Sequence, residues 1–378
     1  MKIALVGASG FVGTRLLEQW RLGGAFEVVP VVRSYSSLAV MARFELPWAV
    51  CDMMDPAALA KAFQGCDAVV HAAIGDAGQI VAMAEAIYRA AEAAHVRRLV
   101  VLSSASVHGQ APPEGTDETS PLHERHAMVY NTAKVRAEAL LRRLSATGSV
   151  KIVLLRPSVV YGPRSRWIAD AARQLLDGSA CLIGDGGAIC NGIYVDNLGH
   201  AIERALVVPQ ASGEAFLVGD AERVTWRDFY QTLADALGVS MEAVRSIEPP
   251  VFHRPLKERV GALTALPFTQ KVLPLFPGKL KRLTKLLLAN WQEPSAGNVW
   301  TLPSEIPPCA VTEEMTLLQQ CRWQLPLQKA RAVLGYEPPV SFAEGMRRSI
   351  AWLDFTGFPI NALNLGHSLD KISRCEKP

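Results

Sequence analysis

The feature that most restricts the fold of this chain is a glycine-rich turn very close to its start. The apolar run Lys2–Val6 leads directly into Gly7-Ala8-Ser9-Gly10-Phe11-Val12-Gly13, and an amphipathic helix is predicted over Phe11–Trp20. Gly7 permits a tight turn, Gly10 lets the backbone approach a pyrophosphate, and Gly13 lets the helix pack against a strand. A strand, this turn and a helix in succession predict a dinucleotide-binding loop, against the alternative of a purely structural turn.

The first half of the chain alternates short β-type runs with helical patterns. This alternation predicts an α/β fold with a doubly wound parallel Rossmann-type sheet. Strands are expected at Lys2–Val6, Glu27–Arg33, Trp48–Cys51, Asp67–His71, Arg97–Ser103 and Val150–Leu155, and helices at Phe11–Trp20, Asp76–His95 and Met128–Thr147. Pro30 removes one ladder hydrogen bond from the second strand, so we expect a bulge or an unpaired amide there.

After Pro163 the pattern becomes mixed, which predicts a smaller, mostly helical substrate-binding part. Helices are expected at Trp226–Leu237 and Leu327–Leu334. The predicted division is a dinucleotide-binding core over 1–163, to which parts of 190–220 return, and a substrate-binding part over 164–378. The second part includes a basic apolar insert at about 246–325. A chain of 378 residues is long enough for both parts.

The end of the second strand carries the evidence on the cofactor. A carboxylate there would suit the adenine ribose of NAD, but this chain has Arg33-Ser34. Because a guanidinium suits a 2′-phosphate, we predict NADP(H) in preference to NAD(H), with Ser9, Arg33 and Ser34 around the phosphate. The alternative is that Arg33 is a solvated strand end.

A second group of residues points to acid–base chemistry. Tyr130 and Lys134 are four residues apart on a predicted helix and therefore share one face. An ammonium near a phenol stabilises the phenolate. Leu102–Gly109, with Ser103, Ser104 and Ser106, follows the fifth strand at the edge of the sheet where ligands bind. A hydroxyl there can hold a substrate oxygen while Tyr130 moves a proton.

Taken together, these motifs resemble the extended short-chain dehydrogenase/reductase family, which contains epimerases, dehydratases and reductases. The matching segments recur in the family's order: Gly7–Gly13, Asp52 and Asp55, His71-Ala72-Ala73, Ser103–Gly109, Tyr130 to Lys134, Leu155–Pro163, Ile193–Asn197 and Lys329–Pro338. The resemblance covers residues 1–240 and 326–355.

The resemblance implies roles for individual residues. Ser104 would be the catalytic hydroxyl and Tyr130 the acid/base, while Lys134 would lower the pKa of Tyr130 and bind the nicotinamide ribose. Asp52 would contact adenine, and Arg156-Pro157 would flank the nicotinamide. The full implied cofactor set is Gly7, Ser9, Gly10, Phe11, Val12, Gly13, Arg33, Ser34, Asp52, Met53, His71, Ala72, Ala73, Ser103, Tyr130, Lys134, Arg156, Pro157, Ser158 and Val159. The implied substrate residues are Ser106, His108, Arg164, Arg166 and Asn191.

Two departures from the family pattern narrow the reaction. Sugar 4,6-dehydratases of the family carry an Asp-Glu pair after the catalytic hydroxyl, and this chain has Ala105-Ser106. We therefore do not expect a 4,6-dehydratase. Many nucleotide-sugar members also have an arginine where this chain has Cys190. This weakens a nucleotide-sugar assignment, although Arg164 and Arg166 are near the same cleft by family analogy.

The leading hypothesis is an NADP-dependent epimerase or ketoreductase that acts on a nucleotide-activated sugar. The alternative is a reductase or dehydrogenase of a bulky apolar alcohol or ketone, such as a sterol-like or flavonoid-like compound. A remote alternative is a non-catalytic NADP-binding protein. The resemblance also implies a homodimer formed by two helices from each subunit.

The insert is distinctly basic. Residues 251–290 contain eight Lys/Arg and one Glu, which is a charge of +7 (8 − 1) in a chain whose net charge is +3. Within it, 277–291 is predicted as an amphipathic helix with a cationic face. It could be a packed lid helix, a peripheral contact with the inner face of a membrane, or a site for an acidic protein.

The net charge, the histidines and the cysteines argue against several other classes of protein. The small net charge argues against nucleic-acid binding. No zinc-type histidine spacing occurs, so we predict no metal, and His71 is expected to shape the cofactor pocket. Seven cysteines without a Cys-x-x-Cys pair predict reduced thiols in a cytoplasmic protein.

Overall fold

A computed structural model of the chain describes residues 1–252, 308–309 and 311–361. Residues Met1–Glu248 and the described residues from Pro308 onward form one compact unit. The predicted amphipathic helix at 277–291 and most of the basic insert lie outside the described residues. The proposed boundary between residues 163 and 164 stays a prediction.

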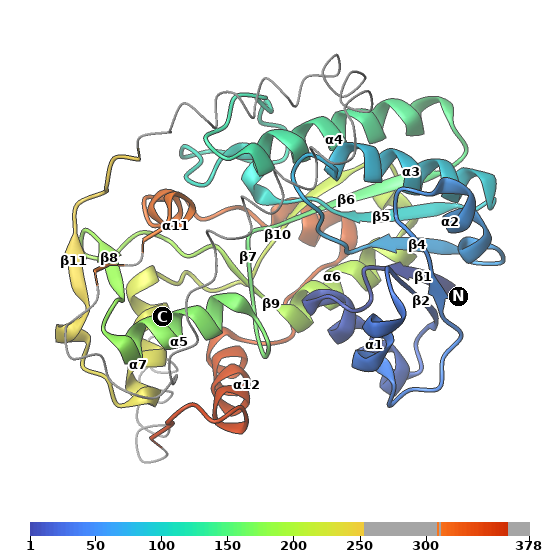
Figure 1. The fold of residues 1–378 in the computed structure, drawn as a ribbon. Coiled ribbons are helices and arrows are strands. Elements are labelled where there is room, and N and C mark those ends of the chain that lie inside the picture. The colour runs from blue at the N-terminus through green and yellow to red at the C-terminus, as the bar shows by residue number, and fades with distance from the viewer. Residues whose placement is uncertain (253–307, 310, 362–378) are drawn as a thin grey trace, which may run out of the picture. The chain divides into compact units, whose positions relative to one another are not determined.

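A seven-stranded parallel sheet forms the centre of this unit (Figure 1). Its strands are β1 (Lys2–Val6), β2 (Glu27–Val32), β3 (Ala49–Val50), β4 (Ala68–His71), β5 (Arg98–Leu102), β6 (Lys151–Pro157) and β10 (Ala215–Val218). They lie side by side in the order β10-β6-β5-β4-β1-β2-β3. This doubly wound order confirms the predicted fold, and it brings the carboxyl ends of β1, β4 and β5 together.

The prediction of a bulge at Pro30 is wrong. The register between β1 and β2 is continuous, with Leu5 opposite Pro30 and Val6 opposite Val31. The Val31 carbonyl accepts a bond from Gly7 on the β1 side, so Pro30 faces the β3 side of the strand. Because β3 pairs only with Val31 and Val32, it needs no amide hydrogen from Pro30.

Helices cover both faces of the sheet. One core joins the sheet to α2 (Pro56–Phe63), α3 (Ile80–Ala93) and α4 (Val129–Thr147). A second core on the other face joins it to α1 (Phe11–Gly23) and α6 (Val195–Val207). Strands buried on both faces explain the almost continuous apolar runs in the sequence.

The C-terminal part has a core of its own around the aromatic rings of Tyr161, Tyr194, Phe229 and Phe342. It contains α5 (Arg166–Asp177), α7 (Trp226–Leu237), α11 (Glu313–Leu318) and α12 (Phe342–Phe355), with the strand pairs β7 (Val159–Tyr161) with β9 (Gly192–Tyr194) and β8 (Cys181–Ile183) with β11 (Arg245–Ile247). The helix predicted at Trp226–Leu237 is confirmed. The helix predicted at Leu327–Leu334 is confirmed: the chain is helical from Gln328 to Leu334, with π-type bonding over Ala330–Leu334, and Gly335 ends it with a φ of 62°.

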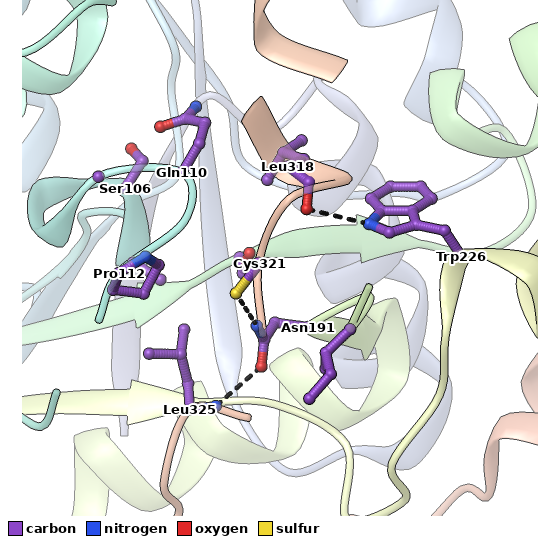
Figure 2. Close-up of a pocket in the computed structure, with 12 residues that line it drawn as sticks. Ser106, Gln110, Pro112, Asn191, Trp226, Leu318, Cys321 and Leu325 are labelled. Atoms are coloured by element: carbon purple, nitrogen blue, oxygen red, sulfur yellow. Dashed lines mark hydrogen bonds between the residues drawn. The ribbon is translucent and has the colours of Figure 1, made fainter. Parts of the chain in front are cut away.

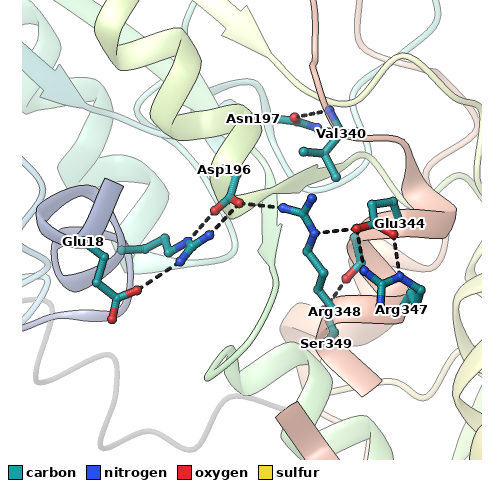
Figure 3. Close-up of polar contacts among 10 residues, drawn as sticks. Glu18, Asp196, Asn197, Val340, Glu344, Arg347, Arg348 and Ser349 are labelled. Carbon is teal, nitrogen blue, oxygen red and sulfur yellow. Dashed lines mark hydrogen bonds and ion pairs between the residues drawn. The ribbon is translucent and has the colours of Figure 1, made fainter. Parts of the chain in front are cut away.

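The chain leaves the sheet after β6 and returns to it as β10. Arg98 on β5 fixes this return, because its guanidinium donates to the carbonyls of Ala205, Leu206 and Val208 at the end of α6 at 2.8–2.9 Å. The start of α6 is fixed as well. Asp196 accepts from Arg15 of α1 at 2.6 Å and from Arg348 of α12 at 3.1 Å (Figure 3).

Candidate active site

The glycine turn has the shape of a dinucleotide cradle. Gly7 has a φ of 85°, and a Cβ atom on it would lie 2.7 Å from the backbone of Ala73. A Cβ on Gly13 would lie 2.2 Å from the Gly7 carbonyl oxygen. Gly10 begins α1 with no side-chain cap, so the first amides of the helix are available to an anion. These residues fit a bound pyrophosphate.

The other predicted cofactor residues lie along the same edge of the sheet. The register places His71 of β4 opposite Val6 of β1, immediately before the glycine turn. His71 is buried, its Nδ1 has no hydrogen-bond partner among the described residues, and burial with the nearby Lys134 lowers its pKa to about 3. Asp52 is exposed and accepts from the Met54 amide at 2.9 Å.

The end of β2 is rich in hydroxyl groups. Arg33 is exposed and has no ion-pair partner within the described part of the chain. The Ser34 hydroxyl lies 2.9 Å from that of Ser36 and 3.1 Å from that of Ser37. Arg33 and these three serines are therefore available to a ligand at the end of the strand.

The structure brings the three predicted catalytic side chains together. Ser104 begins a 3₁₀ turn over Ala105–His108 directly after β5, and its Oγ accepts from the Ser106 hydroxyl at 2.8 Å. Tyr130 and Lys134 lie in the first two turns of α4. The Lys134 Nζ donates to the Leu102 carbonyl at 2.8 Å and lies 5.6 Å from the centre of the Tyr130 ring.

Burial shifts the pKa of both Tyr130 and Lys134. Burial raises the pKa of Tyr130 to about 12, and the Glu314 carboxylate acts in the same direction. The hydrogen-bonding Ser104 hydroxyl and the Arg166 charge oppose that rise in the pKa of Tyr130. Burial lowers the pKa of Lys134 to about 8. Tyr130 is therefore a protonated acid at neutral pH, ready to donate to a carbonyl oxygen.

A buried ionic network holds α4, the helix that carries Tyr130 and Lys134. Glu138, one further helical turn beyond Lys134, accepts from Arg156 at 2.6 Å and from Ser103 at 2.5 Å. Glu138 and Arg156 are each only 2% exposed. Arg156 also contacts His108 Nε2 at 3.1 Å, and burial together with Arg156 lowers the pKa of His108 to about 4.

This network assigns positions to several predicted site residues. Ser103 and Arg156 both donate hydrogen bonds to Glu138, and Arg156 also contacts His108. Glu138 was missed in the sequence, although its spacing of four after Lys134 was a visible signal. It attracts the Lys134 ammonium and opposes the fall in that residue's pKa.

A small pocket lies beside Ser106 (Figure 2). Its described lining is uncharged: Ala105, Ser106, Gly109, Gln110, Pro112, Ser158, Ile189, Asn191, Trp226, Leu318, Cys321 and Leu325. One wall comes from residues 318–325, which we call the cover segment. Sequence reasoning did not identify this segment as part of the site.

Asn191 holds the cover segment in place. Its Nδ2 donates to the Cys321 sulfur at 3.3 Å and its Oδ1 accepts from the Leu325 amide at 2.8 Å (Figure 2). Its Nδ2 also donates to the Trp323 carbonyl at 3.0 Å. The Trp323 indole donates to the Thr116 carbonyl at 2.9 Å. Asn191 was predicted to be a substrate residue, and the structure shows its amide engaged with the protein.

The two predicted substrate arginines are exposed. Arg166 pairs with Glu314 of α11 at 3.2 Å and stacks on Trp167. Arg164 has no ion-pair partner among the described residues, and its φ of 74° is unusual for a residue with a side chain.

The order of these elements agrees with one known family. The model of the NAD dependent epimerase/dehydratase family matches residues 3–219. The chain belongs to this family. The match spans the glycine turn, the catalytic set and the returning strand β10, and it confirms the resemblance seen in the sequence.

Curated relatives of this epimerase/dehydratase family member include a steroid dehydrogenase and an oxoalkanoate reductase. A 3beta-hydroxysteroid-dehydrogenase/decarboxylase isoform from Arabidopsis thaliana is 27% identical over 324 residues, which are 79% of this chain but 50% of the relative. The chain thus spans about half the length of that relative. A 2-alkyl-3-oxoalkanoate reductase from Shewanella oneidensis is 24% identical over 91% of this chain and 84% of the relative.

Among solved structures, a UDP-glucose 4-epimerase from Thermotoga maritima has the same fold. It superposes with a TM-score of 0.65 at 18% identity, covering 94% of this family member and 99% of the epimerase. In the described ranges, no helix is long and apolar enough to cross a bilayer. Within the same ranges, no three His, Cys, Asp or Glu side chains cluster as metal ligands do.

Proposed function

We propose that this protein is an NADP-dependent oxidoreductase that interconverts a secondary alcohol and a ketone on a bulky, largely apolar substrate. The observation that carries this proposal is the pocket beside Ser104 and Ser106, because its described lining has no charged side chain. A nucleotide diphosphate buried against such a wall would lose hydration without gaining an ionic partner. The steroid dehydrogenase relative supports a bulky apolar substrate, and the 2-alkyl-3-oxoalkanoate reductase, whose own substrate carries a carboxylate, supports the ketone chemistry.

In this proposal, the residues of the chain divide the work between binding and proton transfer. Ser104 orients the reacting oxygen, and Tyr130 delivers a proton to it in the direction of reduction. Gly7, Gly10 and Gly13 hold the pyrophosphate, and Lys134 holds the nicotinamide ribose. The nicotinamide, when bound, supplies or accepts the hydride.

The direct test follows absorbance at the NADPH band with two sets of compounds. We expect steady NADPH oxidation with long-chain or sterol-like ketones, and none with UDP- or dTDP-activated sugars. Turnover restricted to the sugars would overturn the proposal. An epimerase would convert a sugar with no net NADPH loss, which product chromatography detects.

The nucleotide-sugar epimerase or ketoreductase is the second candidate. Arg164 favours it, because this exposed cation has no ion-pair partner among the described residues. Cys190 argues against it, since burial raises the pKa of this thiol and keeps it uncharged where many family members place an arginine. The Ala105-Ser106 pair supports our proposal that the protein is not a 4,6-dehydratase.

The preference for NADP(H) rests on the end of β2. An exposed guanidinium at Arg33 and the hydroxyls of Ser34, Ser36 and Ser37 offer donors to a 2′-phosphate. We expect Arg33→Ala to weaken NADPH binding by about 10–100-fold while NADH binding changes little. Fluorescence titration of both cofactors measures this difference, and equal losses would remove the phosphate role from Arg33.

The proposed function is accompanied by a proposed oligomeric state and cellular location. We propose a homodimer through the outer faces of α3 and α4, where exposed charges such as Glu85, Arg136 and Arg143 would make association sensitive to salt. Sedimentation at low and high salt tests this. The described cysteines are free thiols, which supports a cytoplasmic location.

A further inference from the structure

The pocket wall contains few polar atoms that the protein has not already used. Both ends of the Asn191 amide are hydrogen-bonded to the cover segment. The Ser106 hydroxyl donates to Ser104. Among the described lining residues, Gln110 and Ser158 are the side chains that retain unpaired hydrogen-bonding groups.

Gln110 is hydrogen-bonded to a buried neighbour, Asn131. The Asn131 Nδ2 donates to the Gln110 Oε1 at 2.6 Å, and the two residues are 2% and 9% exposed. Since Oε1 accepts from Asn131, Nε2 is the end of the Gln110 amide without a hydrogen-bond partner among the described residues. Asn131 directly follows Tyr130 on α4, so the catalytic acid and this donor are positioned by the same helical turn.

We propose that Gln110 determines substrate specificity by donating a hydrogen bond from Nε2 to a second oxygen of the substrate. The inference rests on the proposed function, and it names the substrate class more closely. Ser104 and Tyr130 serve the reacting oxygen. Ser106, which is bonded to Ser104, lines the same pocket as Gln110, so the two groups border one space.

The chemistry of the wall selects the kind of second oxygen. A carboxylate next to Gln110 would meet no cation among the described lining residues and would be costly to bury. An ester or second carbonyl needs only one donor. The substrate class is therefore a bulky ketone, or the matching alcohol, that bears a neutral carbonyl or ester group.

A pair of matched substrates tests this role. Wild-type protein and the Gln110→Glu variant are assayed with NADPH on a long-chain 3-oxo ester and on a ketone of equal chain length without the ester. The variant keeps an oxygen for Asn131 but replaces the pocket donor by an acceptor. We expect kcat/KM for the 3-oxo ester to fall by about fiftyfold and that for the plain ketone by less than about threefold.

Controls separate this effect from misfolding and from failure of the proposed function. Gln110→Met removes the donor without adding charge and should show the same substrate-dependent loss. Gln64→Met, at an exposed position, should behave as wild type. NADPH titration confirms that each variant is folded. Equal losses on both substrates would overturn the role of Gln110 alone, whereas a wild-type protein inactive on both ketones would overturn the proposed function and this inference with it.

Discussion

The site has a cofactor side, the glycine turn, and a substrate side, the pocket wall. The contacts that hold each of them join residues at very different separations in the sequence. The cofactor turn is closed by backbone contacts among neighbours, such as the Gly10 amide with the Gly7 carbonyl at 3.0 Å. The pocket wall is closed by side chains far apart in sequence. Asn191 reaches Trp323, 132 residues away, and Trp323 reaches Thr116, 207 residues away. Local geometry therefore fixes the first side, and tertiary packing fixes the second.

If short-range geometry also fixes Ser104, Tyr130 and Lys134, removing the Tyr130 hydroxyl should stop turnover without weakening cofactor binding. We expect Tyr130→Phe to lower turnover by about a thousandfold, because it removes the proton donor and leaves the ring in place. NADPH binding should stay within about twofold, measured by fluorescence. Retained activity would show that another group moves the proton.

The glycine turn should tolerate no added atom. We expect Gly13→Ala to destabilise the protein by about 1–3 kcal/mol and to weaken NADPH binding, since its Cβ would collide with the Gly7 carbonyl oxygen. Gly23→Ala is the matched control at the end of the same helix, where a Cβ meets nothing within 4 Å. Thermal unfolding of both variants measures the difference. Similar melting temperatures would show that the turn is not tightly packed.

The substrate side should respond to loss of a distant bond. We expect Asn191→Ala to raise KM for the ketone about tenfold, because the cover segment loses its anchor, with little change in NADPH affinity. Arg322→Ala, at an exposed residue of the cover segment, is the control and should be nearly silent. A fall in NADPH affinity as large as the change in KM would erase the distinction between the two sides.

The smallest expected effect is on pH dependence. Burial lowers the pKa of Lys134 to about 8, so its ammonium is present below that pH and lost above it. Tyr130, with a pKa of about 12, stays protonated throughout. We expect the rate of ketone reduction to fall about fourfold between pH 7 and pH 8.5. Lys134→Arg should remove this decline even if it slows the reaction, and an unchanged decline would assign it to another group.

The same contrast explains what the sequence could predict. The glycine turn, the spacing of Tyr130 and Lys134, and the six strands from β1 to β6 depend on short-range patterns, and the structure places them within a few residues of the predicted bounds. Helices α2, α5, α6, α11 and α12 were not predicted. In α5 the hydrophobic residues face a core built from distant segments, and no local signal named that partner.

Two residues of the site show more clearly what could not be predicted from the sequence. Arg156 stays a predicted neighbour of the nicotinamide, and the structure adds that its charge is paired with Glu138 in the interior. Asn191 was assigned to the substrate, yet it binds the cover segment. In both cases the residue type was informative, but its partner comes from another part of the chain and becomes visible only in three dimensions.

The Arg98 guanidinium, bound to the last turn of α6, has a consequence for dissecting the protein. The returning strand β10 completes one edge of the sheet, beside β6. A fragment cut after residue 163 would lose β10 and α6, uncover the backbone of β6 and leave Arg98 without its three carbonyl acceptors. A cofactor-binding fragment therefore has to extend through β10 at Val218 rather than end at residue 163.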